Sequence, residues 1–147
     1  MYHQLIYSSR CSVTFGMTSI LREIVTASER KNSLDRITGF LLFDKIQFMQ
    51  ILEGDRDDVD RSFERIAQDA RHDRVILLHR RDVATRAFPE WCMGGVIRAP
   101  EIDHIFRRYD WPNLLARSSS ADRLVGMARE LSTWEQERST QRGLSSR

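Results

Sequence analysis

The sequence predicts an α/β domain of the α+β kind, in which a ferredoxin-like β-α-β-β-α-β-β sheet carries two helices on one face and is followed by C-terminal helices. Two apolar runs, residues 37–43 and 47–53, form the strongest hairpin signal in the chain. Segments in which apolar residues recur at helical spacing flank this hairpin on both sides. After Pro100 helical spacing replaces the strand pattern, so we expect the sheet to end before this proline.

The first strand and the first helix are expected within residues 4–33. Residues 4–8 are rich in side chains that favour strands. Thr18 is a candidate N-cap, and apolar side chains recur at helical spacing through residues 20–28. Polar and turn-forming residues at 30–33 are expected to end this helix.

The hairpin and the second helix follow. Residues 37–43 are apolar on both faces, residues 44–45 suit a tight turn, and residues 47–53 run back as far as Gly54. Acidic residues then open a helix, where they complement the positive end of its dipole. The apolar stripe of this helix is formed by Val59, Phe63, Ile66 and Ala67.

Two more strands complete the predicted sheet, at residues 75–78 and 91–97. Beyond it, apolar residues between 102 and 109 indicate a short helix that stops near Trp111 and Pro112. A polar linker at 117–120 precedes a helix whose apolar stripe is Leu124, Met127, Ala128, Leu131 and Trp134.

The chain is expected to divide into a domain that holds the sheet, residues 1–98, and a helical extension, residues 99–147, whose tail from residue 137 is polar and frayed. The apolar stripe of the extension has no partner within its own helix. It must therefore pack on the free face of the sheet, which we prefer, or on another subunit.

Composition excludes several classes of protein. The 147 residues suit one domain with some extra length, and the net charge of +2 makes a nucleic-acid partner unlikely. Cys11 and Cys92 show no metal-ligand spacing and fit a reducing interior. With no signal segment at the N-terminus and no apolar stretch of about 18 residues, we expect a cytoplasmic protein and no membrane contact. Phosphate-loop, dinucleotide and hydrolase motifs are missing, so we expect no enzyme.

Gln50 stands out as an amide in a strand whose two faces are otherwise apolar. Strand alternation places Phe48, Gln50 and Leu52 on one face. A buried amide must find hydrogen-bond partners, so Gln50 either satisfies a neighbouring backbone group or serves a site, and the pattern leaves both open. Tyr7 also lies in the middle of a strand, where an ordinary core tyrosine is the more common case.

Other polar residues have simpler interpretations. Asn32 follows the predicted first helix and suits a cap. Arg65 and Asp69 are four residues apart on one helix face, where a surface ion pair is the usual outcome. Glu53 and the aspartates after it lie close together near the start of the predicted second helix. We interpret them as complementing the helix dipole and not as an acid–base pair.

Five segments, in collinear order, resemble BLUF domains, which sense blue light using FAD. The resemblance covers about residues 3–97, and although each segment is weak alone, the five together are highly specific. The segments are residues 5–9, 28–32, 37–54, 66–72 and 86–93.

The resemblance implies particular roles. Tyr7 would be the photoactive tyrosine, and Gln50 the switch glutamine beside flavin N5 and O4. Asn32 would bind the pyrimidine edge of the flavin. Trp91 and Met93, which the pattern places on the last strand and would otherwise assign to the core, resemble the pair associated with signalling.

The resemblance also implies the residues that hold FAD. A planar flavin needs apolar walls, for which Val25 is a further candidate. Lys31 stands where many relatives carry histidine or asparagine, and its ammonium can still donate to a flavin carbonyl. The implied set is Tyr7, Ile24, Lys31, Asn32, Phe48, Gln50, Arg65, Ile66, Asp69 and His72, with no metal.

The resemblance thus implies a blue-light photoreceptor that holds FAD without a covalent bond. Electron and proton transfer from Tyr7 to the flavin would rearrange the hydrogen bonds of Gln50. The last strand and the C-terminal helices would then signal to a separate partner protein of unknown identity. Alternatively, the C-terminal helices would hold copies of the chain together in a homo-oligomer.

Two other classes of protein compete with this interpretation. One is a small acylphosphatase-like hydrolase, which would use an arginine to hold phosphate and Asn32 to position water, although no glycine-rich phosphate loop accompanies such an arginine. The other is a protein-interaction module or an RNA binder of similar topology. An RNA binder would expose aromatic side chains on a central strand, whereas the pattern around Gln50 is that of a buried strand.

Overall fold

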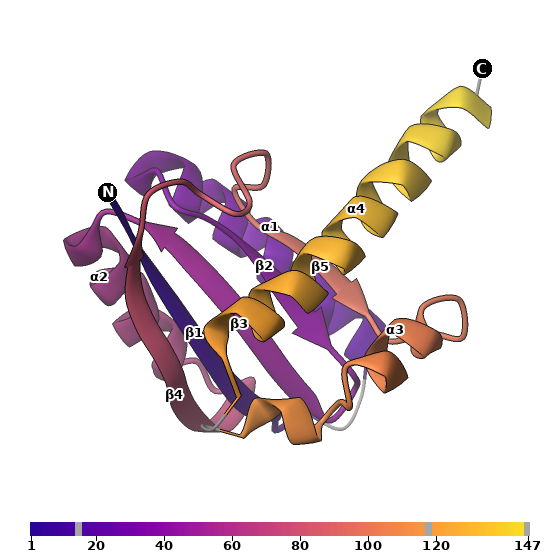
Figure 1. The fold of residues 1–147 in the computed structure, drawn as a ribbon, viewed down its shortest axis with the longest axis horizontal. Helices are drawn as coiled ribbons and strands as arrows, with labels where there is room; N and C mark the ends of the chain where they lie inside the picture. The colour runs from indigo at the N-terminus through magenta and orange to yellow at the C-terminus, as the bar shows by residue number, and fades with distance from the viewer. Residues whose placement is uncertain (14–15, 117–118, 146–147) are drawn as a thin grey trace.

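A five-stranded sheet forms the centre of the computed structural model, which describes residues 1–13, 16–116 and 119–145 (Figure 1). The strands lie in the order β4-β1-β3-β2-β5. Neighbouring strands are antiparallel except β2 and β5, which run parallel. This arrangement confirms the predicted ferredoxin-like order with its additional strand. The strands are β1 (Tyr2–Cys11), β2 (Thr38–Phe43), β3 (Gln47–Gly54), β4 (His72–Val83) and β5 (Gly94–Ile97).

Helices cover both faces of the sheet. Helices α1 (Met17–Asp35) and α2 (Arg56–Ala67) lie behind it in Figure 1, whereas α4 (Ala121–Ser145) crosses in front of it. The short helix α3 (Asp103–Arg108) and a 3-10 turn (Asn113–Leu115) join β5 to α4. The two predicted helices on one face are therefore confirmed, and the extension covers the other face.

Strand alternation divides the core into two clusters, one on each face. Phe48 and Leu52 of β3 pack with Tyr7 toward α1 and α2. Met49 and Ile51, on the opposite face of the same strand, pack toward α4. Gln50 shares the face of Phe48, as the alternation predicts, and its side chain is only 1% exposed.

The β2–β3 hairpin has a fixed register. Leu41 lies opposite Gln50 in the pairing of the two strands. In the turn, the Asp44 carboxylate accepts hydrogen bonds from the backbone amides of Ile46 and Gln47, at 2.8 and 2.6 Å. The hydrogen bonds between the two strands stop at the turn, and the Asp44 side chain binds the backbone amides that they leave free. The predicted turn is therefore held in one conformation.

The segment before β5 differs from the prediction. Strand β5 begins at Gly94, so Trp91 and Met93 lie in the connection that precedes it and not on the strand. In this connection the Trp91 amide donates to the Phe88 carbonyl at 3.2 Å, and Pro89 has no amide to offer a strand ladder. The alternating apolar pattern of residues 91–97 thus comes from a turn followed by a short strand.

Two other element bounds differ from the sequence prediction. Helix α1 continues past Asn32, which lies in its last turn and is not a residue after the helix. The helix ends because Arg36 adopts a left-handed conformation and donates its amide to the Asn32 carbonyl. Strand β4 extends from residue 72 to residue 83, well beyond the predicted 75–78, because almost its whole length pairs with β1.

Helix α4 packs on the sheet, as the sequence analysis preferred. Its Leu124, Met127, Ala128 and Leu131 are completely buried, and the cluster they join includes Ile6, Phe40 and Met49 from the strands. The helix continues to residue 145, so the backbone of the tail expected to fray is helical there; its glutamate, arginine and glutamine residues are good helix formers. Thr18, the predicted N-cap, instead lies inside α1, which begins at Met17 after an N-cap at Gly16. Linker residues 117–118 lie outside the described residues.

Among the described residues, no helix combines the length and apolar character needed to cross a bilayer.

The packing of α4 can be tested by shortening one buried leucine. Leu131→Ala removes a fully buried side chain between α4 and the sheet, and we expect the free energy of unfolding in urea to fall by about 2–5 kcal/mol. Leu34→Ala is the matched control, because Leu34 also lies on a helix but is 84% exposed. Its effect should stay within about 0.5 kcal/mol. Equal effects of the two substitutions would contradict the packing of α4.

Candidate functional site

A cleft opens between the sheet and the two helices on its inner face, α1 and α2. The empty space in and above it amounts to about 600 Å³, including the open mouth. Its lining combines apolar side chains on the walls with a few polar groups. The lining residues are Tyr7, Ile24, Ala27, Ser28, Lys31, Leu41, Phe48, Gln50, Arg65, Ile66, Asp69, Arg71 and His72.

Tyr7 and Gln50 face each other on the floor of this cleft. They are direct cross-strand partners in the pairing of β1 with β3. The Tyr7 hydroxyl donates a hydrogen bond to Gln50 Oε1, and Gln50 Nε2 donates to Met93 Sδ at 3.2 Å. All three side chains are buried, so the structure links the cleft floor to the connection before β5 through one amide.

The Tyr7 phenol lies in an apolar environment. The ring of Phe63 lies 5.4 Å from its own, and His72 meets it edge-on at 6.2 Å. Burial raises the pKa of Tyr7 far above its usual value, and the nearby Asp69 carboxylate adds to the rise. The phenol therefore keeps its proton in the folded protein unless an electron is removed from the ring.

Charged side chains gather at the mouth of the cleft. Arg71 Nε donates to the Asp69 carboxylate at 2.9 Å, and this hydrogen bond lowers the pKa of Asp69. The sequence analysis expected Asp69 to pair with Arg65. The helix ends at Ala67, however, so Asp69 lies in the turn beyond it and no longer shares a helix face with Arg65. Arg65 lines the cleft instead.

His72 fixes the end of α2 against β1. Its Nε2 lies 2.6 Å from the Ile66 carbonyl, and its Nδ1 lies 2.8 Å from the Ser9 hydroxyl. Because a carbonyl only accepts, Nε2 carries a proton. His72 is the first residue of β4.

Nine of the ten predicted cofactor-binding residues line the cleft, and Asn32 is the exception. The Asn32 amide donates to the Cys92 carbonyl at 2.9 Å. Val25, the further wall candidate, packs in the cluster beneath the cleft.

Four lining residues were not predicted: Ala27, Ser28, Leu41 and Arg71. The helical spacing from Ile24 indicates Ala27 and Ser28, and the hairpin register indicates Leu41 opposite Gln50. No local pattern in the sequence indicates that Arg71 would line the cleft.

The two predicted signalling residues point to different faces of the sheet. Met93 is completely buried in the cluster that includes Tyr7. Trp91 packs edge-on against Phe40, at 5.9 Å between ring centroids, in the cluster on the α4 side. Met93 is therefore the neighbour of Gln50 in this structure.

Glu53 belongs to β3, as the predicted strand bounds require, but its carboxylate does not join the aspartates at the start of α2, with which the sequence analysis grouped it. It is completely buried at the end of β3, on the face opposite Gln50. Its carboxylate accepts hydrogen bonds from the backbone amides of Ala87 and Phe88, at 2.7 and 2.9 Å. Asp57 and Asp58 do occupy the first turn of α2. In the described part of the chain, no three side chains of the metal-binding types gather as a metal site would require.

The fold and the cleft define a domain that binds a small, largely apolar ligand against a buried phenol and amide. The family model described as "Sensors of blue-light using FAD", named BLUF, matches residues 2–94. The chain belongs to the BLUF family, whose members sense blue light with FAD.

Two solved structures and two curated relatives support this assignment. The dark state of BlrB, a BLUF protein, matches with a TM-score of 0.77 and 26% identity over 88% of this chain and 96% of that one. The photo-activated state of BlsA matches with a TM-score of 0.76 and 28% identity over 89% and 94%.

Among curated proteins, the photoactivated adenylate cyclase subunit beta of Euglena longa is 36% identical over 74 residues, which are 50% of this chain and 9% of the cyclase. The blue light- and temperature-regulated antirepressor BluF of Escherichia coli (strain K12) is 36% identical over 58 residues, 40% of this chain and 14% of the antirepressor. The chain thus spans a small fraction of the length of these relatives.

The burial of Tyr7 predicts an unusual alkaline titration. Its pKa is raised above the value of about 10 that it has when unfolded, so its contribution to stability is complete below about pH 10 and declines as the pH rises further. Tyr7→Phe should leave the phenolate absorbance of the folded protein unchanged, but should remove one of three tyrosine signals from the protein unfolded in guanidinium. A step near pH 10 in the folded protein that Tyr7→Phe abolishes would contradict the assigned environment.

Proposed function

We propose that this blue-light sensor uses Tyr7 and Gln50 as its photoactive pair and passes the change through Met93 to the C-terminal helices and a partner protein. The observation that carries the proposal is the hydrogen bond from Tyr7 to Gln50 on the floor of the cleft. It places an electron and proton donor beside a group that can rotate, both facing the space that would hold the cofactor.

The cleft residues fit the flavin of FAD. Ile24, Leu41, Phe48 and Ile66 offer apolar walls for a planar ring. Within the described part of the chain, the only hydrogen bond from the Gln50 amide nitrogen goes to a thioether sulfur, which is a weak acceptor. This buried donor is therefore suited to a stronger acceptor at the edge of a ligand in the cleft.

The cations at the cleft mouth suit the rest of the cofactor. Lys31 and Arg65 line the opening from α1 and α2, one on each side. We propose that they attract the diphosphate of FAD, since ammonium and guanidinium groups both bind phosphate oxygens. Asn32, held against the Cys92 carbonyl, would bind the ring edge through the remaining capacity of its amide.

Bound FAD supplies the absorption of blue light and, once excited, a strong demand for an electron. Tyr7 meets this demand: its ring gives up one electron, and its O–H bond, which already points at Gln50 Oε1, gives up the proton. Because burial keeps the phenol protonated beforehand, loss of the electron and loss of the proton are coupled. Both return to Tyr7 when the charges recombine.

Gln50 retains the change after Tyr7 is restored. Rotation of its amide exchanges the carboxamide oxygen and nitrogen, so that the nitrogen faces Tyr7 and the oxygen faces Met93. The thioether of Met93 carries no proton to donate, and its hydrogen bond with Gln50 is then lost. The light state therefore differs from the dark state at the connection before β5.

We propose that residues 1–98 form the sensor and residues 99–147 transmit its state. BLUF domains act as sensors and are joined to a cyclase in the Euglena longa relative, whereas the Escherichia coli relative is a blue light- and temperature-regulated antirepressor. By analogy with the antirepressor, we propose a separate protein as the partner. Association of the chain into a homo-oligomer through residues 99–147 stays a prediction.

The competing functions have less support. A hydrolase that holds phosphate with an arginine needs a glycine-rich loop beside it, but Arg65 and Arg71, which line the cleft, lie in a stretch with no glycine between residues 55 and 93. An RNA platform needs exposed aromatic rings on the central strands, but Tyr7 and Phe48 are both buried. The sensor explains the buried phenol and amide that the other two functions leave unused.

The photoactive pair can be tested by spectroscopy on two variants. Tyr7→Phe and Gln50→Leu should both retain flavin, because the apolar walls are intact, but should lose the reversible red shift under blue light. Tyr109→Phe and Gln47→Leu are the matched controls, since Tyr109 bonds Glu130 on the α4 side and Gln47 lies at the start of β3. Both controls should keep the red shift. A normal photocycle in either of the first two variants would remove the assigned role.

The cations at the mouth can be tested by comparing two flavins. Arg65→Gln should weaken the binding of FAD by roughly fivefold, as expected for loss of one partly exposed charge contact, and should leave riboflavin, which has no phosphate, unaffected. Arg56→Gln, at the other end of the same helix, should change neither affinity. Calorimetric titration with both flavins measures the effect. An equal loss for FAD and riboflavin would show that Arg65 contacts the ring and not the diphosphate.

A further inference from the structure

A seven-residue segment, residues 87–93, passes around the edge of the sheet and joins its two faces. Phe88 stacks on Phe40 in the cluster on the α4 side, with ring centroids 5.8 Å apart. Met93, five residues later, is buried in the cluster on the cleft side. The segment therefore connects the two cores without passing through the hydrogen-bonded strands.

The cleft end of the segment is held by three contacts. Met93 Sδ accepts from Gln50, and the Cys92 carbonyl accepts from the Asn32 amide at 2.9 Å. The Trp91 carbonyl accepts from the backbone amide of Gly39 at 3.0 Å. A Cβ at Gly39 would also lie 3.2 Å from the Met93 methyl group, so the cleft end of the segment packs closely against the start of β2. This end of the segment is thus in direct contact with Gln50.

The other end is held by Glu53 and by α4. The buried Glu53 carboxylate accepts hydrogen bonds from the backbone amides of Ala87 and Phe88, so it binds two consecutive residues of the segment. On the other side of the same residue, the Ala87 carbonyl accepts from the Arg129 guanidinium of α4 at 2.6 Å. Ala87 thus lies directly between a fixed strand carboxylate and the output helix.

Glu53 also fixes the start of α4. Its carboxylate accepts from the Gln4 amide nitrogen at 3.2 Å, and the Gln4 oxygen accepts from Arg81 at 2.8 Å. Arg81 in turn donates to Asp122, in the first turn of α4, at 2.7 Å. None of these contacts involves residues 87–93. The first turn of α4 therefore has polar anchors outside the segment, and in the described part of the chain the Arg129 contact is the hydrogen bond that joins α4 to the segment.

We propose that Arg129 and Glu53 are positioning residues for signal output: Glu53 fixes the resting place of Ala87, and Arg129 transmits its displacement to α4. The inference rests on the proposed function, because it takes the loss of the Met93–Gln50 contact as its starting event. Release of Met93 shifts residues 87–93, the Ala87 carbonyl leaves Arg129, and α4 loosens from residue 129 onward while its first turn stays in place.

Hydrogen exchange in the dark and under continuous blue light tests this inference on the FAD-loaded chain. In the unaltered protein, light should accelerate exchange in residues 87–93 and in α4 from residue 129 onward, but not in its first turn. In Arg129→Gln, α4 should already exchange in the dark at the light rate, and light should add nothing further. The red shift, read from the same samples, should be unchanged, because Arg129 lies on the face opposite the cleft.

Two further variants separate positioning from simple packing. Arg129→Lys keeps a donor that can reach a carbonyl, so it should restore part of the light-induced increase in exchange. Arg123→Gln is the matched control on the same helix, because the Arg123 guanidinium lies 5.2 Å over the Tyr109 ring instead. It should keep the full increase. Glu53→Gln should reproduce the effect of Arg129→Gln on α4 from residue 129 onward, since an amide nitrogen cannot accept from a backbone amide, and should also accelerate exchange in the first turn, which Glu53 anchors through Gln4 and Arg81.

Two outcomes would overturn the inference. One is a full light-induced increase in α4 exchange in Arg129→Gln. The other is a normal red shift in the unaltered protein with no change in exchange in residues 87–93 or α4. Absence of any red shift in the unaltered, FAD-loaded protein would instead overturn the proposed function, so the two failures are distinguishable.

Discussion

The register of β1 against β3 is the constraint on which the rest of the structure depends. It places Tyr7 directly opposite Gln50, so that a phenol and an amide meet inside an apolar core. A slip of one residue would turn Gln50 toward α4 and leave both polar groups without their partner. Because buried side chains on both faces of β3 oppose such a slip, the cores that stabilise the fold also maintain the photoactive pair. Stability and function therefore share one determinant.

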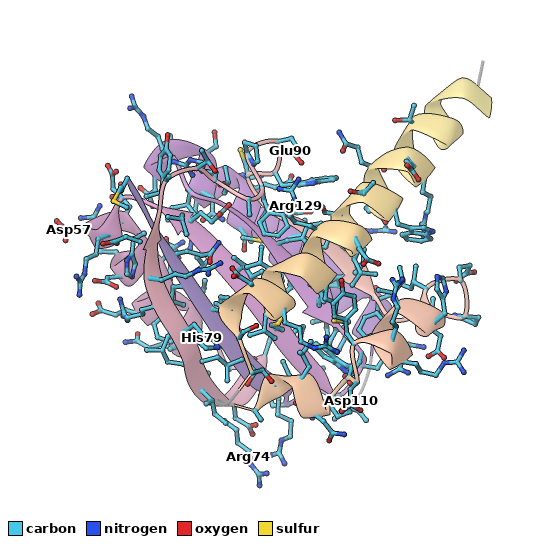
Figure 2. All side chains as sticks on the ribbon, in the orientation of Figure 1. Asp57, Arg74, His79, Glu90, Asp110 and Arg129 are labelled. Carbon is cyan, nitrogen blue, oxygen red and sulfur yellow. The ribbon has the colours of Figure 1, made fainter. Side chains whose placement is uncertain are left out.

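The same strand supports both ends of the proposed signalling route. Gln50 faces the cleft and Glu53, three residues later, faces α4, because successive side chains of a strand point to opposite faces. Each contacts the segment that passes around the sheet edge, one through a thioether and the other through backbone amides. The contacts differ in strength: a thioether is a weak acceptor, whereas a carboxylate is a strong one. A local change at Gln50 can thus release the cleft end of the segment and let the rest of the segment shift while the sheet stays intact. Figure 2 shows Arg129 on α4 and Glu90 in the connecting segment close to the same edge of the sheet.

Much of the fold could be predicted from the sequence, because its signals are local. Alternation in β3 and helical spacing in α4 indicated which face each buried residue would occupy, and the resemblance to BLUF domains indicated nine lining residues of the cleft. The errors concern contacts between distant segments. Met93 and Trp91 were assigned to a strand, although Asn32 and Gly39 hold their backbone in a turn. Glu53 was placed correctly in the strand, but its carboxylate was grouped with the acidic residues at the start of α2, because nothing local indicates its amide partners more than thirty residues away. Such pairings leave no periodic pattern in a single sequence.

The central claim is that the amide of Gln50 changes its hydrogen bonds when the protein absorbs blue light. A light-minus-dark infrared difference spectrum of protein carrying isotopically labelled glutamine measures this directly. The account predicts a glutamine side-chain carbonyl band that changes on illumination, shifts with the label and recovers in the dark together with the flavin spectrum. A normal red shift with no label-sensitive glutamine band would contradict the account.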